Sequence, residues 1–262
     1  MSVQAGFAQL ARSGGRGALV TVIRVDDGAT TAAVVGARML VGADGEPQGS
    51  LGDARLDEAG RTAAAELMWA EHCEMREVQG VGLFVDVVAP PPRLMVFGAV
   101  DFAGALCRMA RAAGWRPYVI DPRGRFATVQ RFTDAEEVVV AWPDAAFARL
   151  GGIDRATFIA VLTHDPKLDD AALEIALRSD AAYVGAMGSR RAHAMRRERL
   201  LARGMTEEEL GRISAPIGLD LGGLTAEEMA LSIMAEVVAV RNGHPGGRLS
   251  AMTSGRIHEV GG

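Results

Sequence analysis

The segment Val96–Leu106, VFGAVDFAGAL, joins a buried strand to an apolar helical pattern and decides the fold of the C-terminal part of the chain. A dinucleotide-binding turn at such a junction carries three glycines. The first allows the tight turn, the second lets a pyrophosphate approach, and the third lets helix and strand pack closely. Here Gly98 fills the first place, whereas Val100 and Ala103 fill the others. Because the branched side chain of Val100 stands where a pyrophosphate would lie, we expect the fold without the usual NAD contact.

Strands and helices alternate from this region onward. Strands are predicted at 93–99, 116–121, 137–142, 157–165 and 181–188, and helices at 102–114, 169–179, 189–204 and 225–243. The last helix opens on Thr225 with Glu228 three residues later, which is a capping box. Alternation of this kind indicates βαβ units and a mostly parallel sheet.

The first 88 residues follow a different pattern. Strands are predicted at 17–25, 36–41 and 80–90, a helix at 56–72, and a tight hairpin at Asp44-Gly45. APPPR at 89–93 marks a boundary, because consecutive prolines form a stiff extended spacer. We therefore predict an α/β protein with a small N-terminal α+β domain (1–88), a proline-rich linker (89–93) and a Rossmann-like parallel-sheet domain (94–262).

Composition excludes several classes of protein. The net charge of −5 argues against non-specific nucleic-acid binding, which needs a basic surface. No apolar run reaches the roughly 18–20 residues that cross a bilayer, and no signal peptide is recognisable, so we expect a cytoplasmic protein without a membrane span. Cys73 and Cys107 fit no metal or redox spacing, and we expect a surface thiol and a core thiol, respectively.

The segment Val184–His193, VGAMGSRRAH, favours an anion. Two glycines lead from a strand to a helix that Ser189 is predicted to cap, with Arg190 and Arg191 in its first turn. A helix N-terminus offers unpaired N–H groups and a partial positive charge, and arginine adds bidentate donors suited to phosphate. The alternative is a solvated basic helix face.

Two further polar positions leave alternatives open. Asp121 follows the second strand of the parallel sheet, where an acid would hold a ribose, but it could instead pair with Arg123 in a purely structural turn. His164 in THDPKLDD (163–170) could be a metal ligand, a general acid or base, or a histidine bonded to Asp165 or to backbone. No standard hydrolase or zinc motif occurs.

Several motifs together resemble the XdhC/CoxI family of accessory factors for molybdenum hydroxylases. They are ALVTVI, GARMLV and DGEPQGS in the N-terminal part, and VLTHDPKLDDAAL, YVGAMGSRRAHAMRRERL, PIGLDLGGLTAEEMALSIMAEVVAVRNG and GRIH in the C-terminal part. The resemblance implies a protein that binds molybdenum cofactor, as molybdopterin or its cytosine dinucleotide form, assists its maturation and delivers it. NAD(P) is not expected as a cofactor.

The resemblance also implies partners: an apo molybdenum hydroxylase such as xanthine dehydrogenase or carbon monoxide dehydrogenase, and a cysteine desulfurase. The apolar last helix needs covering, which either a homodimer or a second face of the sheet would provide equally well. No catalytic or metal-ligating residue is predicted. The predicted cofactor-binding residues are Gly98, Asp121, Arg123, His164, Asp165, Gly185, Gly188, Ser189, Arg190, Arg191 and Asp220.

The chain departs from the family pattern in the N-terminal part. Many members follow the Gly-Ser turn with a Gly-Gly-Cys segment, but this chain reads GSLGDARLDE at 49–58, without cysteine. Thiolate chemistry on molybdenum or sulfur is therefore not expected at this loop. Two other functions stay open: an NAD(P)-dependent oxidoreductase built on the C-terminal fold, and a non-catalytic scaffold that docks a hydroxylase. A cofactor chaperone is favoured over a turnover enzyme.

Overall fold

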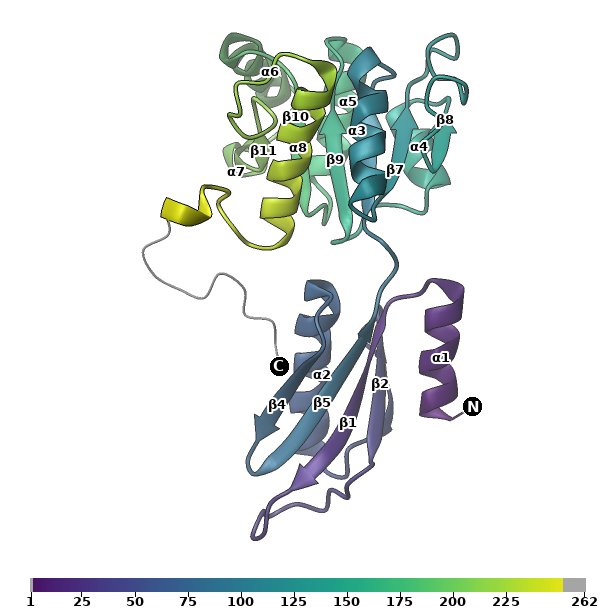
Figure 1. Ribbon diagram of the computed structural model, residues 1–262, viewed down its shortest axis with the longest axis vertical. Coiled ribbons are helices and arrows are strands. Elements are labelled where there is room, and N and C mark those ends of the chain that lie inside the picture. The colour runs from purple at the N-terminus through teal and green to yellow at the C-terminus, as the bar shows by residue number, and fades with distance from the viewer. Residues whose placement is uncertain (1, 252–262) are drawn as a thin grey trace. The chain divides into compact units, whose positions relative to one another are not determined.

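A computed structural model describes residues 2–251 of the chain, and they form two compact units (Figure 1). One unit contains residues 2–90 and the other residues 91–251. The chain passes from the first to the second within its run of prolines, whose rings cannot donate to a sheet ladder. The GRIH motif at 255–258 lies outside the described residues. No helix among residues 2–251 is long and apolar enough to span a membrane.

The N-terminal unit is an antiparallel sheet with a helix packed on it. Its elements are α1 (Val3–Ser13), β1 (Gly17–Val25), β2 (Arg38–Gly42), β3 (Pro47–Ser50), α2 (Ala54–Ala70), β4 (Glu74–Val78) and β5 (Val81–Val88). The strand order is β3-β2-β1-β5-β4. The core lies between α2 and the sheet, where Leu56, Leu67 and Met68 are buried against Val20 and Leu83. The predicted hairpin at Asp44-Gly45 is confirmed between β2 and β3.

The C-terminal unit is a parallel sheet covered by helices on both faces. Its elements are β6 (Arg93–Phe97), α3 (Asp101–Ala112), β7 (Arg116–Ile120), β8 (Glu137–Val139), α4 (Pro143–Arg149), β9 (Thr157–Val161), α5 (Pro166–Leu177), β10 (Tyr183–Ala186), α6 (Arg190–Ala202), α7 (Glu207–Gly211), β11 (Ile213–Ser214), α8 (Ala226–Arg241) and the 3-10 turn η1 (Leu249–Ala251). All strand pairs in this sheet are parallel.

The strand order β11-β10-β9-β6-β7-β8 is that of a dinucleotide-binding Rossmann sheet. Helices α3 and α8 pack on one face, and α4 and α5 on the other, each layer burying its own apolar cluster. The predicted fold class is thus confirmed. Because the chain moves from β6 outward to β7 and later returns to β9 on the other side of β6, ligands of this fold bind where β6 and β9 end.

Several elements fall outside the predicted strands and helices, among them α1, β4, α4 and β11. Each is short or buries few of its own residues. Helix α1 buries only Gly6, and β4 has no fully buried residue. Such segments take their structure from the neighbours they pair with, so their own hydrophobic periodicity is a weak signal.

Candidate functional site

The carboxyl edge of the parallel sheet carries the turns that follow β6, β9 and β10. Gly98 follows β6 with φ +115°, and a Cβ built on it would lie 2.3 Å from Cγ2 of Thr163. A glycine is therefore required here by the close approach of the next turn and by the backbone angle. This packing explains Gly98 without a ligand.

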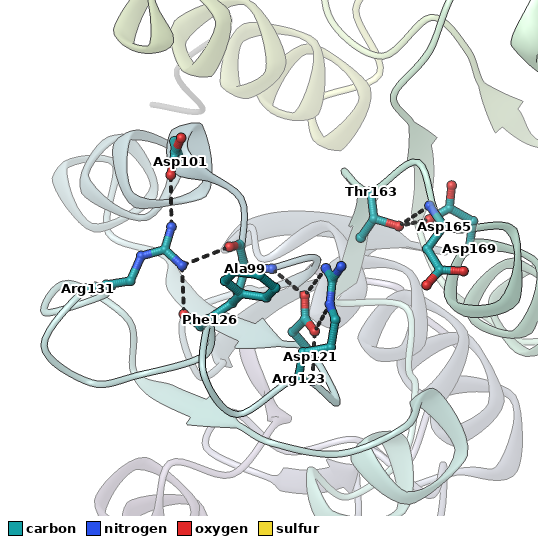
Figure 2. A network of polar contacts seen from close by, with 9 residues as sticks. All are labelled: Ala99, Asp101, Asp121, Arg123, Phe126, Arg131, Thr163, Asp165 and Asp169. Carbon is teal, nitrogen blue, oxygen red and sulfur yellow. Dashed lines mark hydrogen bonds and ion pairs between the residues drawn. The ribbon is translucent and has the colours of Figure 1, made fainter.

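The β6–α3 turn satisfies its own polar groups, as Figure 2 shows. The carboxylate of Asp121 is fully buried and accepts the N–H of Ala99 at 2.9 Å. It also accepts hydrogen bonds from the backbone N–H of Arg123 and from two guanidinium nitrogens of the same residue, at 2.8–2.9 Å. The contacts of the structural alternative for Asp121 are thus all present. A direct role of Asp121 or Arg123 in ligand binding stays a prediction.

The side chain of Arg131 also occupies polar groups at the start of α3. Arg131 donates to the carbonyl oxygens of Ala99 and Phe126 and to the carboxylate of Asp101 (Figure 2). Asp101 occupies the first turn of α3, where its negative charge opposes an incoming phosphate. Val100 is the N-cap residue and offers no side-chain hydrogen bond. The glycine turn that defines the fold is therefore poorly suited to bind an anion.

The turn after β9 forms a small polar network. The hydroxyl of Thr163 donates to the buried carboxylate of Asp169, and the N–H of Asp165 donates to the oxygen of Thr163 at 3.0 Å. Asp165 caps α5 by accepting the N–H of Lys167. Burial raises the pKa of Asp169, although hydrogen bonds from Thr163 and Arg196 oppose that effect. The network ties the β9 turn to the helix that follows it.

His164 lies in this turn with an exposed side chain. Among residues 2–251 it has no hydrogen-bond partner, so the alternative in which it is bonded to Asp165 or backbone is not realised. Within the same range no group of three or more histidine, cysteine or acidic residues could hold a metal ion. A ligand role for His164 stays a prediction.

The two glycines around β10 differ in role. A Cβ at Gly185, inside the strand, would lie 2.5 Å from both Ile217 and the hydroxyl of Tyr183, so this glycine serves close packing. Gly188 has φ +135° and turns the chain into α6. Ser189 is the N-cap and accepts the N–H of Ala192 at 3.2 Å, as predicted. The β10–α6 turn thus presents a capped helix end at the sheet edge.

Arg190 and Arg191 open α6 with exposed side chains. Neither guanidinium has a hydrogen-bond or ion-pair partner among residues 2–251. No acidic residue stands in the first turn of this helix. The helix end, with two uncommitted arginines, provides the charge distribution that favours an anion.

Arg196 was not among the predicted site residues. Its side chain is only 4% exposed, and Nη2 donates to the carbonyl of Met187 at 2.9 Å and to Asp169 at 3.2 Å. Its Nε and Nη1 atoms are buried without a partner. The signal that could have found it is helical spacing, because position 196 lies on the same helix face as the buried Leu200.

A hollow of about 210 Å³ lies beside the β10–α6 turn. It is lined by Met187, by the loop at 217–223 and by the first half of α8, and Asp220 stands in its wall. Glu236 of α8 holds this loop by accepting the hydroxyl of Tyr183 and the N–H of Gly218. Asp220 and Met187, the residue before Gly188, both line this hollow, whereas Gly98, Asp121 and Arg123 do not.

The N-terminal unit has a hollow of its own, of about 480 Å³, at the start of α2. Asp53 caps α2 there, and the hydroxyl of Thr31 donates to its carboxylate at 2.5 Å, which lowers the pKa of Asp53.

The two cysteines lie as predicted: Cys107 is buried, Cys73 is exposed, and both are unpaired.

Two family models match the chain. The model of the XdhC Rossmann domain matches residues 94–237, and the model of the XdhC and CoxI family matches residues 10–78. A crystal structure of a xanthine dehydrogenase from Bacillus halodurans covers 97% of this chain and 98% of its own, with a TM-score of 0.52 and 19% identity. At that identity the likeness shows the fold alone.

Three curated proteins are similar in sequence. The uncharacterized protein YqeB of Escherichia coli is 24% identical over 86% of this chain and 44% of its own length. A probable subunit of xanthine dehydrogenase from Bacillus subtilis is 27% identical over 62% of this chain and 47% of its own. The molybdenum cofactor insertion chaperone PaoD of Escherichia coli is 31% identical over 58% of this chain and 41% of its own. The matches thus span less than half of each relative.

Proposed function

Because this chain belongs to the XdhC and CoxI family, we propose that it binds molybdenum cofactor, assists its maturation and inserts it into an apo molybdenum hydroxylase. Two relatives bear names from this process: one is named for xanthine dehydrogenase, and the other is a molybdenum cofactor insertion chaperone. The cofactor is a phosphorylated pyranopterin, so its site needs an anion subsite and room for a flat ring.

The start of α6 is the observation that carries the proposal. Gly188 gives a backbone turn without a side chain, Ser189 caps the helix, and Arg190 and Arg191 project without partners among residues 2–251. Free N–H groups, the helix dipole and bidentate donors together favour a phosphate. The turn after β6 lacks these features, because Asp121 occupies its free N–H and its nearby arginines are paired with Asp121 and Asp101.

The neighbouring hollow suits the ring of the ligand. Sites for whole drug-sized ligands measure about 300–1,000 Å³, so a hollow of about 210 Å³ has room for the ring system of the cofactor and leaves its phosphate, and any attached nucleotide, outside. Apolar side chains line it, and the carboxylate of Asp220 can accept hydrogen bonds from the amino edge of a pterin. Met187 borders both places, so a ring in the hollow leaves its phosphate near the α6 turn.

The test is cofactor binding and transfer by the purified chain. We expect it to bind molybdopterin or the cytosine dinucleotide form and to restore activity to a matching apo-hydroxylase. Each of Arg190→Ala and Arg191→Ala should lower cofactor affinity by about one to two decades, the cost of one charge-assisted contact. Arg203→Ala, which removes an exposed arginine at the far end of α6, is the matched control and should bind normally.

Failure to bind either cofactor form, together with failure to activate the hydroxylase, would overturn the proposal. NADH and NADPH serve as comparison ligands. Tight binding of NADH, with unchanged affinity in the Arg190→Ala and Arg191→Ala variants, would instead favour an oxidoreductase.

A cysteine desulfurase remains part of the proposal as a partner in sulfuration. Burial raises the pKa of the Cys107 thiol to about 12, so this thiol is protonated and shielded. Cys73 is exposed at the start of β4, and its Sγ lies 3.3 Å from the N–H of Val87. We expect one thiol of the folded chain to react with a disulfide reagent, and none after Cys73→Ser. Persulfide loading that survives Cys73→Ser would exclude this thiol as the sulfur carrier.

A further inference from the structure

Arg196 is a buried charge whose hydrogen-bonding capacity is only partly used. Its side chain is 4% exposed, and two of its nitrogens, Nε and Nη1, have no partner. Burying an unpaired polar group is destabilising, and burying an unpaired charged group more so. A charge held at this cost requires an explanation, and the surroundings of the guanidinium supply one.

The guanidinium lies against the turn at which α6 begins. A Cβ built on Gly188 would lie 3.9 Å from Nη2 of Arg196 and 4.0 Å from its Nη1. The carbonyl of Met187, the residue before Gly188, accepts a hydrogen bond from Nη2. Because Gly188 has no side chain, this residue places no side-chain atoms between the charge and a ligand seated on the turn. The positive end of the α6 dipole lies at the same place, so the two effects add.

Asp169 opposes this charge through Nη2, the guanidinium nitrogen that also lies nearest to Gly188. Its carboxylate pairs with Nη2 of Arg196 at 3.2 Å and also accepts the Thr163 hydroxyl. The two side chains thus form a buried ion pair with its positive partner next to Gly188. In the poorly screened interior, the strength of this pair decides how much positive potential reaches the turn.

We propose that Arg196 is the fixed positive charge of a phosphate subsite at the N-terminal end of α6, and that Asp169 sets how strongly a bound phosphate feels it. The ligand class is a phosphate monoester or pyrophosphate. The proposal rests on the proposed function for the choice of site, but it concerns the anion alone. In this subsite the exposed Arg190 and Arg191 contact the phosphate directly, and the buried Arg196 adds a fixed positive charge behind the turn.

The test uses calorimetric titration of the full-length chain with inorganic pyrophosphate. Asp169→Asn keeps the size of the side chain and removes its charge, so we expect pyrophosphate to bind about tenfold more tightly. Arg196→Gln should weaken binding by at least about tenfold. Arg197→Ala, in which an exposed ion pair with Glu207 is lost, is the matched control and should change affinity less than about twofold.

The opposite changes in pyrophosphate affinity expected for Asp169→Asn and Arg196→Gln distinguish a role in binding from a purely structural role. If Arg196 and Asp169 only hold α5 and α6 together, both variants lower the melting temperature and neither changes pyrophosphate affinity, which overturns the proposal. If Arg196→Gln does not fold, Asp169→Asn decides alone: unchanged or weaker binding overturns the proposal.

Failure here is distinct from failure of the proposed function. A wild-type chain that binds molybdenum cofactor but not pyrophosphate overturns the phosphate subsite and leaves the function standing. A chain that binds pyrophosphate with the expected variant pattern, but no molybdenum cofactor, supports the subsite and overturns the function.

Discussion

The turns after β6 and after β10 share the same backbone geometry but differ in the charged groups around them. Each places a glycine of positive φ, Gly98 or Gly188, between a buried strand and the N-terminus of a helix. At the first, the free N–H and the nearby arginines are already engaged by carboxylates: Asp121 accepts the Ala99 N–H and pairs with Arg123, and Asp101 in the first turn of α3 pairs with Arg131. The second has a serine cap and arginines. A glycine turn therefore provides the shape of an anion site, and the neighbouring charges decide whether it can act as one.

The largest expected effect comes from adding a methyl group at each glycine. Gly98→Ala would place a Cβ 2.3 Å from the Thr163 side chain at φ +115°, and overpacking plus backbone strain should cost about 3–5 kcal/mol. At Gly188 the nearest atom is the Ala192 Cβ at 3.2 Å, so strain dominates and the cost should be about 1–2 kcal/mol. Urea unfolding measures both. Equal losses would contradict the view that Gly98 is fixed by packing.

A smaller effect is expected from removing the carboxylate of Asp121 at the turn after β6. Asp121→Ala leaves the buried N–H of Ala99 without its acceptor and should lower the free energy of unfolding by about 2–3 kcal/mol. Pyrophosphate affinity should not change, because that ligand belongs to the other turn. Asp101→Ala, at an exposed position in the same region, is the control and should be close to neutral. A loss of ligand affinity in Asp121→Ala would move the site to the first turn.

The smallest effect is in the pH dependence of stability, which should have opposite signs at Asp121 and Asp169. Burial alone would raise the pKa of Asp121, but hydrogen bonds from Arg123 and from the Ala99 N–H outweigh it and lower that pKa below 3.8. The stability it contributes is present above pH 3.8 and is lost as the pH falls through the folded-state pKa. Burial raises the pKa of Asp169, so its contribution is present below pH 3.8 and is lost as the pH rises through the raised value.

Urea unfolding of the two asparagine variants between about pH 3 and about pH 8 measures this difference. Relative to the wild type, Asp169→Asn should gain stability as the pH rises. Asp121→Asn should lose stability relative to the wild type as the pH rises over the acidic part of the range. Parallel pH profiles for the two variants would show that the two carboxylates sit in equivalent environments, which would contradict the contrast between the two turns.

Much of the fold could be predicted because its signals are local. The strand Gly17–Val25 and the capping box at Thr225 and Glu228 follow from residue type and spacing alone, and both are confirmed. The same holds for Ser189 as the cap of α6. These features depend on backbone geometry within a few residues, which sequence periodicity reports directly.

The site could be predicted only in part, because side-chain pairing is not local. For Asp121 the sequence left two roles open, and only the fold shows that the Arg123 and Ala99 donors occupy its carboxylate. Arg196 pairs with Asp169 across 27 residues of chain, and no spacing rule gives such a partner.

By itself, the sequence determined the alternation of strands and helices, the glycine turns and the helix caps, since each follows from the conformational preferences of neighbouring residues. The tertiary structure alone decided which turn is closed by carboxylates and which is left with positive charge. The physical reason is that burial and ion pairing depend on which distant side chains the packed helices bring together, and those energies are set only once the sheet has formed.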